Sequence, residues 1–254
     1  MSEESAIAET TRTPHADARQ EARALLEEAR SRAVVLRALG GLAVRLLCPS
    51  AARPPLERPY KDIDLIGLRD QRAAIDELLV NFGYEPDESF NLLSGHARLY
   101  YRDHENEREL DVFLDRMDMC HSLELADRLD LSELTLTPTD MLLSKLQVYE
   151  TNERDLKDAT ALLVDCGVDV GHVARTLAND WGWWRTVTEV LEKVSTYVAS
   201  IDLPERPRVE AKIDELGAAI DAEPKGRRWR LRARVGDRMR WYELPEEDHA
   251  EEVP

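Results

Sequence analysis

The chain has 254 residues, 43% of them apolar, and a formal net charge of −17. This apolar content is enough to fill one substantial domain or two small ones, whereas the negative charge argues against a protein that coats nucleic acid, because phosphate binding relies on clustered lysine and arginine. There is no run of about 18 apolar residues and no apolar segment near the N-terminus, and the three scattered cysteines, Cys48, Cys120 and Cys166, are expected to be buried free thiols. These features predict a cytoplasmic protein with no membrane partner.

The first half of the chain mixes helical and strand patterns. Residues 1–15 are small and polar, which predicts a disordered tail. From Ala16 to about residue 31, apolar residues recur at helical spacing, and residues 33–39 form an apolar run that predicts a buried strand closed by two glycines. The elements expected next are a short helix at 42–49, a proline-rich loop at 50–60, a strand at 62–67, a helix at 69–82, and two strands at 96–102 and 109–115 joined as a hairpin.

After Leu134 the patterns are helical. Thr137-Pro138-Thr139-Asp140 is typical of a helix start, and further helices are expected at 153–163, 171–178, 186–201 and 208–220. The sequence therefore predicts an α+β fold, with a small mixed sheet flanked by helices in residues 16–135 and a helical domain in residues 136–222. A basic segment at 223–242 and an acidic tail at 243–254 complete the chain.

The basic segment is unusual in so acidic a chain. Residues 225–241 carry a charge of +7, which leaves −24 for the remainder. Trp229 and Trp241 are interleaved with arginines, as in many contacts with nucleic acids. The alternation of arginine and apolar residues over 228–235 equally suggests an amphipathic strand whose arginines pair with the acidic body, and charge balance favours this second interpretation.

A glycine pair and an arginine precede the strand at 62–67. Gly40 and Gly41 end the first strand, and the exposed backbone N–H groups of a glycine turn at a helix start favour the phosphates of a nucleoside triphosphate. Arg58 carries a fixed fork of donors that pairs with phosphate. Lys61 is a weaker candidate for the same task.

Three aspartates on two strands form the expected metal site. A period of two places Asp62 and Asp64 on one face of their strand, and Asp111 lies on the face opposite the aliphatic stripe of its own strand. Carboxylates arranged in this way coordinate two Mg²⁺ ions about 4 Å apart, one activating the attacking oxygen and the other neutralising the leaving pyrophosphate. Glu109 and Asp115 share the face of Asp111, so either replaces it if the register differs.

The order of these motifs resembles a known family. A strand, Gly-Gly, a short helix, Arg58 and the Asp62-Ile63-Asp64 strand are similar to the DNA polymerase beta-like nucleotidyltransferase superfamily, particularly its minimal and AbiEii-type bacterial branches. In that family an arginine likewise stands four residues before the first metal aspartate, whereas Tyr60 occupies a position where serine or threonine is usual. The resemblance covers roughly residues 33–165.

The helical half adds to the resemblance. Residues 142–163 are similar to the AbiEii-type pattern of a helical lysine followed by an Arg-Asp-x-x-Asp helix, which implies that Lys145 contacts nucleotide phosphates and that Asp155 orients or activates the acceptor. From the residues alone, a lysine among leucines also fits a helix flank. Asp155 and Asp158 also fit a solvated face or pairs with Arg154 and Lys157.

The expected function is transfer of a nucleoside monophosphate from a nucleoside triphosphate to an acceptor hydroxyl, with release of pyrophosphate. The acceptor stays open between an RNA end such as that of tRNA, a protein and a small molecule. The AbiEii-type proteins are toxins, so the resemblance to them also implies a cognate antitoxin as a partner. The resemblance favours RNA or protein, while the acidic body disfavours a long RNA footprint. The alternatives are an inactive nucleotide-binding module and a partner-binding module with structural carboxylates.

Overall fold

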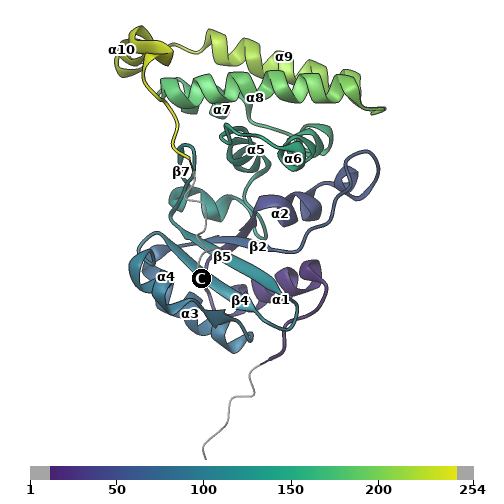
Figure 1. Ribbon diagram of the computed structural model, residues 1–254, viewed down its shortest axis with the longest axis vertical. Helices are drawn as coiled ribbons and strands as arrows, with labels where there is room; N and C mark the ends of the chain where they lie inside the picture. The colour runs from purple at the N-terminus through teal and green to yellow at the C-terminus, as the bar shows by residue number, and fades with distance from the viewer. Residues whose placement is uncertain (1–11, 245–254) are drawn as a thin grey trace, which may run out of the picture.

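The computed structural model describes residues 12–244 of the chain. A small sheet with helices against it forms one part of the molecule, and a stack of helices forms the other (Figure 1). The expected α+β class, with a small mixed sheet flanked by helices and a helical C-terminal region, is confirmed. Within the described residues, no helix combines the length and the apolar composition needed to cross a membrane.

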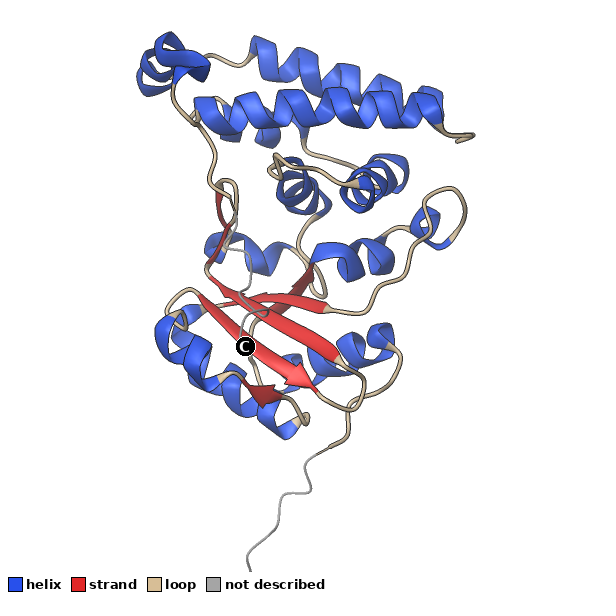
Figure 2. Ribbon diagram, viewed as in Figure 1, coloured by secondary structure: helices blue, strands red, loops and turns tan. Residues whose placement is uncertain are grey.

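Within residues 12–244 the main sheet has five strands in the order β1-β2-β5-β4-β3 (Figure 2). Strands β2 and β5 are parallel and the other neighbouring strands are antiparallel, so the sheet is mixed. A separate hairpin pairs β6 with β7. The bounds are β1 Leu36–Leu39, β2 Ile63–Gly67, β3 Glu85–Pro86, β4 Arg98–Asp103, β5 Arg108–Leu114, β6 Arg116–Asp118 and β7 Ser122–Glu124.

The period of two along the central strands separates an apolar face from a polar one. Ile63 and Leu65 on β2 and Leu110 and Val112 on β5 are fully buried in the main core. Each such side chain contributes about 1.5–3 kcal/mol through burial. Helices α1 (Ala18–Ser31) and α3 (Arg72–Asn81) lie on the side of the sheet away from the C-terminal helices (Figure 1).

The C-terminal helices begin at the capping signals present in the sequence. The Thr137 side chain accepts a hydrogen bond from the backbone of Asp140, with Pro138 in the first turn, and Asn152 and Asp155 form a reciprocal capping box. The remaining helices are α2 Gly40–Leu47, α4 Glu88–Leu93, α5 Pro138–Leu146, α6 Glu153–Asp165, α7 Val170–Leu177, α8 Trp181–Ser200, α9 Arg206–Ala222 and α10 Arg227–Val235. Short 3-10 turns cover Pro49–Ala52, Arg69–Gln71, Ala126–Leu131 and Gly236–Arg238.

The predicted strand in the basic segment is wrong, because these residues form helix α10. The partly buried residues of the helix are Trp229, Arg232, Ala233 and Val235, and the first three recur at helical spacing. The helix docks through aromatic contacts, with Trp229 edge-on to Trp184 of α8 at 5.2 Å between ring centroids. In the described part of the chain, the arginines of α10 form no ion pair with the acidic body, so the expected charge pairing is also absent.

The two predicted tails fall mostly outside the described residues, which leave out 1–11 and 245–254. Residues 12–15, which were expected to belong to a disordered tail, instead lie against the sheet part. Arg12 forms an ion pair of 2.9 Å with the buried Glu21 of α1, and the backbone N–H of His15 donates to the same carboxylate. Arg12 and His15 are therefore held in place by the buried carboxylate of Glu21. The amino-acid composition of the segment does not reveal this contact. The three cysteines are buried free thiols, as expected.

Candidate active site

The two glycines make room for charged side chains. Gly40 begins α2 with a φ of +69°, and a Cβ at this position would collide with the carboxylate of Asp64. A Cβ on Gly41 would collide with the guanidinium of Arg58. Because L-residues rarely adopt this φ and Asp64 leaves no space for a side chain, Gly40 is required at the start of α2. At Gly41 the missing side chain lets the end of Arg58 approach the backbone. The expectation that this turn cradles phosphates stays a prediction.

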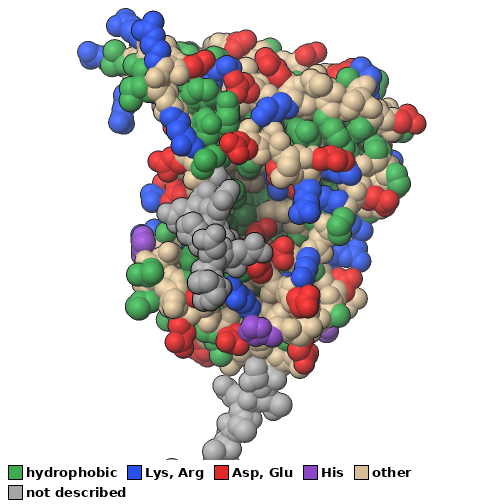
Figure 3. Space-filling view, viewed as in Figure 1, with side chains coloured by type: hydrophobic (Ala, Val, Ile, Leu, Met, Phe, Trp, Pro, Cys, Tyr) green, Lys and Arg blue, Asp and Glu red, His purple; other side chains and the backbone are tan. Residues whose placement is uncertain are grey.

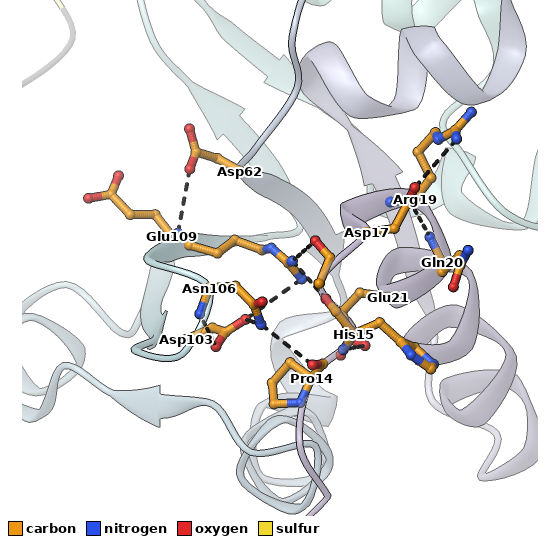
Figure 4. Close-up of polar contacts among 12 residues, drawn as sticks. Pro14, His15, Asp17, Arg19, Gln20, Glu21, Asp62, Asp103, Asn106 and Glu109 are labelled. Atoms are coloured by element: carbon orange, nitrogen blue, oxygen red, sulfur yellow. Dashed lines mark hydrogen bonds and ion pairs between the residues drawn. The ribbon is translucent and has the colours of Figure 1, made fainter.

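The register of the parallel strands places the predicted carboxylates side by side. Asp64 on β2 is directly opposite Asp111 on β5, and Asp62 immediately precedes β2. The backbone N–H of Glu109 donates to the Asp62 carboxylate at 3.5 Å, and Figure 4 shows these two residues next to each other. Asp115 lies beyond the end of β5, where it accepts from the backbone of Arg69. Of the three acids expected on this strand, Glu109, Asp111 and Asp115, it is Asp111 that lies opposite Asp64.

The pKa of Asp64 reflects its burial and the neighbouring acids. Its pKa is raised from 3.8 to about 6, first by burial and then by the negative charges of Asp111 and Asp62. Lys145 and Arg98 lower the same pKa, which shows that both cations are near the carboxylate.

Arg98 is a residue that the sequence did not reveal. It lies on β4, and its Nε is 2.6 Å from Oδ1 of Asp111. The guanidinium also lies 5.2 Å from the ring centroid of Phe113. The available signal was the alternation of Arg98 with the buried Leu99, which places the arginine on the carboxylate face.

The donor chemistry of the site suits a hard divalent cation. Asp62, Asp64 and Asp111 offer carboxylate oxygens, the ligands that Mg²⁺ prefers, and burial together with the charges of Asp111 and Asp62 raises the pKa of Asp64, which disfavours its ionised form. Among residues 12–244, however, no three acidic, histidine or cysteine side chains are gathered closely enough to hold a metal ion. The residues fit the ion in type and in strand register, and their side chains have to turn toward one another to bind it.

A second charged group joins the sheet part to the helical part. Arg58 donates two hydrogen bonds to Asp158 of α6, from Nε at 2.9 Å and from Nη2 at 2.7 Å. Lys145 of α5 lies 2.9 Å from the same carboxylate. Asp158 is 1% exposed, so it is neither on a solvated face nor paired with its helical neighbours. The three residues form a cluster in which Asp158 is buried and both cations are partly buried, here called the Arg58–Asp158–Lys145 cluster.

Tyr60 completes the wall beside this cluster. The Arg58 guanidinium lies 4.0 Å from the centroid of the Tyr60 ring. Burial, together with the charge of Asp158, raises the pKa of Tyr60 to about 12. The tyrosine at this position therefore remains neutral and stacks against the arginine.

Two predicted residues have other contacts. The Asp155 carboxylate accepts a hydrogen bond from the backbone of Asn152 in the capping box and lies 3.9 Å from Lys145. Its expected action on the acceptor stays a prediction. Lys61 is exposed and lies 3.8 Å from the exposed Glu107, so it is not part of the Arg58–Asp158–Lys145 cluster.

The site lies where the two parts of the molecule meet. Asp64 and Asp111 belong to the sheet, and Lys145 and Asp158 belong to α5 and α6. The space-filling view shows a recess between the two parts, with acidic side chains near it (Figure 3). Anionic groups of the sheet and cationic groups of α5 and of the loop before β2 thus belong to elements that meet between the two parts, which is the combination that phosphoryl chemistry needs.

Comparisons with known proteins give limited similarity. No protein family matches the sequence, and no curated protein does. Among solved structures, the lincosamide antibiotic adenylyltransferase LnuA bound to lincomycin is 15% identical over 56% of this chain and 94% of its own, with a TM-score of 0.39. The antibiotic-resistance factor ANT(2'')-Ia is 11% identical over 55% of this chain and 79% of its own, with a TM-score of 0.37. An antigenic nucleotidyltransferase-like protein from Paracoccidioides brasiliensis is 16% identical over 84% of this chain and 96% of its own, with a TM-score of 0.40.

Proposed function

We propose that this protein is a metal-dependent nucleotidyltransferase, which moves a nucleoside monophosphate from a nucleoside triphosphate to an acceptor hydroxyl. The observation that carries the proposal is the pairing of Asp64 with Asp111 on adjacent parallel strands, with cations at the same place. Lys145 of α5 and Arg98 of β4 are those cations, and Arg58 shares the carboxylate of Asp158 with Lys145. Carboxylates for a divalent cation and fixed positive groups for phosphates are the two requirements of this chemistry.

The residues divide the reaction between them. Arg58 and Lys145 hold the phosphates of the nucleotide next to Gly41, and Asp62, Asp64 and Asp111 would hold two Mg²⁺ ions that neutralise charge on the reacting phosphates. The acceptor oxygen forms a bond to the α-phosphorus, and the bond from that phosphorus to the bridging oxygen breaks. Pyrophosphate leaves with the bonding electrons, and the hydroxyl proton passes to a carboxylate beside the acceptor oxygen.

The direct test is incubation of the purified protein with each α-³²P-labelled nucleoside triphosphate, Mg²⁺ and either total RNA or a cell lysate. The Asp62→Ala, Asp64→Ala double variant is the matched control, with its fold checked by circular dichroism. Label transfer by the wild type alone is the expected result. Absence of transfer, together with absence of Mg²⁺-dependent nucleotide binding in calorimetry, would sink the proposal.

One observation favours a second candidate, a module that binds nucleotide without turnover. Asp111 is held by Arg98 at 2.6 Å, and the acidic side chains of the described residues are not gathered around a metal site. Such a module would bind a nucleoside triphosphate through the Arg58–Asp158–Lys145 cluster and release no pyrophosphate. Pyrophosphate release in the same assay separates the two functions. The AbiEii-type branch and a cognate antitoxin stay predictions.

A further inference from the structure

The charged groups follow a fixed order across the polar face of the sheet. Gly40 and Gly41 follow β1, Asp64 lies on β2, Asp111 on β5, and Arg98 on β4, and these strands are neighbours in that order. The phosphate-binding groups of the proposed function lie at the β1 end of this row. In phosphoryl transfer the attacking and leaving oxygens lie roughly in line on opposite sides of phosphorus. The acceptor therefore has to approach from the β4 end, past Asp111.

A cavity of about 490 Å³ lies at that end of the row. Arg98 and Phe113, which are opposite each other on β4 and β5, form part of its wall. Phe113 is two residues beyond Asp111 on the same strand and so shares its face. The cavity thus begins where the Arg98–Asp111 ion pair ends, on the side away from the glycines.

The walls of the cavity are apolar with balanced charge. Phe90 of α4, Phe113 and Met119 supply apolar surface, and the Arg98 guanidinium lies 5.7 Å from the Phe90 ring centroid. The charged groups of the wall are two arginines and two acids, Arg98, Arg116, Asp118 and Glu243. Arg116 is already paired with Asp118 at 2.7 Å. A chain of phosphates gains no net attraction from such a wall, whereas a compact molecule with an apolar body buries surface there.

We infer that this cavity is the acceptor subsite and that the acceptor is a small molecule with an apolar body and a free hydroxyl. The inference rests on the proposed function and decides among the acceptor classes left open. The cavity volume of about 490 Å³ lies within the range of about 300–1,000 Å³ found for small-molecule sites. The hydroxyl reaches the α-phosphorus beside Asp111. Its oxygen forms the new bond to phosphorus as the bond to the pyrophosphate oxygen breaks.

The test fills the cavity without touching the carboxylates. His96 is exposed and lines the cavity, so His96→Trp places an indole inside it. Leu92 is 84% exposed on the adjacent α4 and is not part of the wall, so Leu92→Trp adds the same group outside. Each protein is incubated with labelled nucleoside triphosphates and three separated fractions of a cell extract, namely molecules below 3 kDa by filtration, RNA and protein.

We expect the wild type and Leu92→Trp to label the small-molecule fraction and His96→Trp to lose at least tenfold of that label, with nucleotide binding unchanged. Label in RNA or protein, or equal labelling of small molecules by His96→Trp, overturns the inference while the transferase function stands. If no fraction is labelled, the proposed function fails. In that case binding of 8-anilinonaphthalene-1-sulfonate, an apolar ring system with one anionic group, decides for the cavity. Binding weakened at least tenfold by His96→Trp alone supports a ligand site, and binding unaffected by it overturns one.

Discussion

Asp64→Asn is expected to stabilise the metal-free protein while it abolishes nucleotidyl transfer. The pKa of Asp64 is raised from 3.8 to about 6 by burial and by Asp111 and Asp62, so its ionised form is disfavoured in the folded state. A rise of about two pKa units corresponds to roughly 3 kcal/mol at full ionisation. This value is an upper limit, because Asp64 retains partial access to water.

The sign of the pH dependence follows from the direction of the shift. Because the folded pKa lies above the unfolded one, the wild type loses stability as pH rises from about 4 through 6, whereas asparagine does not titrate. We therefore expect the gain in unfolding free energy for Asp64→Asn to grow with pH, from at most about 1.5 kcal/mol at pH 5 to at most about 3 kcal/mol at pH 8. Urea unfolding in EDTA at both pH values measures it.

Two controls sharpen this experiment. Asp70 is exposed in the turn before α3, so Asp70→Asn changes the same group without the crowding and is expected to shift stability by less than about 0.5 kcal/mol. Adding Mg²⁺ is expected to stabilise the wild type and leave Asp64→Asn unchanged, which narrows the gap. A destabilised Asp64→Asn protein, or a gain that is equal at both pH values, would refute the idea that burial and the neighbouring acids disfavour the ionised form of Asp64.

Three further predictions concern the groups around Asp64. Arg58→Lys keeps the charge but loses the two-pronged contact with Asp158, and we expect the KM for nucleoside triphosphate to rise about tenfold in steady-state kinetics. Asp158→Asn leaves two partly buried cations without their shared anion, so urea unfolding should show a loss of up to about 3–5 kcal/mol; a loss below about 1 kcal/mol contradicts the role of Asp158 as the shared anion. Gly40→Ala should lower kcat/KM at least about 100-fold while circular dichroism remains native, because the new methyl group displaces Asp64.

The alternation of side chains was sufficient to predict the carboxylate face. Asp64 and Asp111 each sit between buried aliphatic neighbours, and a strand period of two has only one way to place them. The choice of Asp111 over Glu109 and Asp115 depended on strand register, which side-chain alternation does not specify across a parallel pair. The structure places Asp111 opposite Asp64.

Other contacts could not be derived from local patterns. Asp158 fits a helical pair with a neighbouring lysine equally well, and only the packing of α6 against the loop of Arg58 buries it. Arg98 is one of several arginines near a hairpin, and its partner follows from the antiparallel pairing of β4 with β5. In α10, alternating arginines mimic a strand over a few residues, and contacts of Trp229 with α8 favour the helix.

The carboxylate of Asp158 is an internal counter-anion that Arg58 and Lys145 share. Arg58 and Lys145 both already pair with this one carboxylate on α6, so in the proposed function nucleotide binding replaces one anion with another. Single small anions such as sulfate offer little advantage over the resident carboxylate, whereas a triphosphate contacts several groups at once. In the proposed function, competition with the Asp158 carboxylate therefore selects ligands by their number of phosphates before any base or acceptor is recognised.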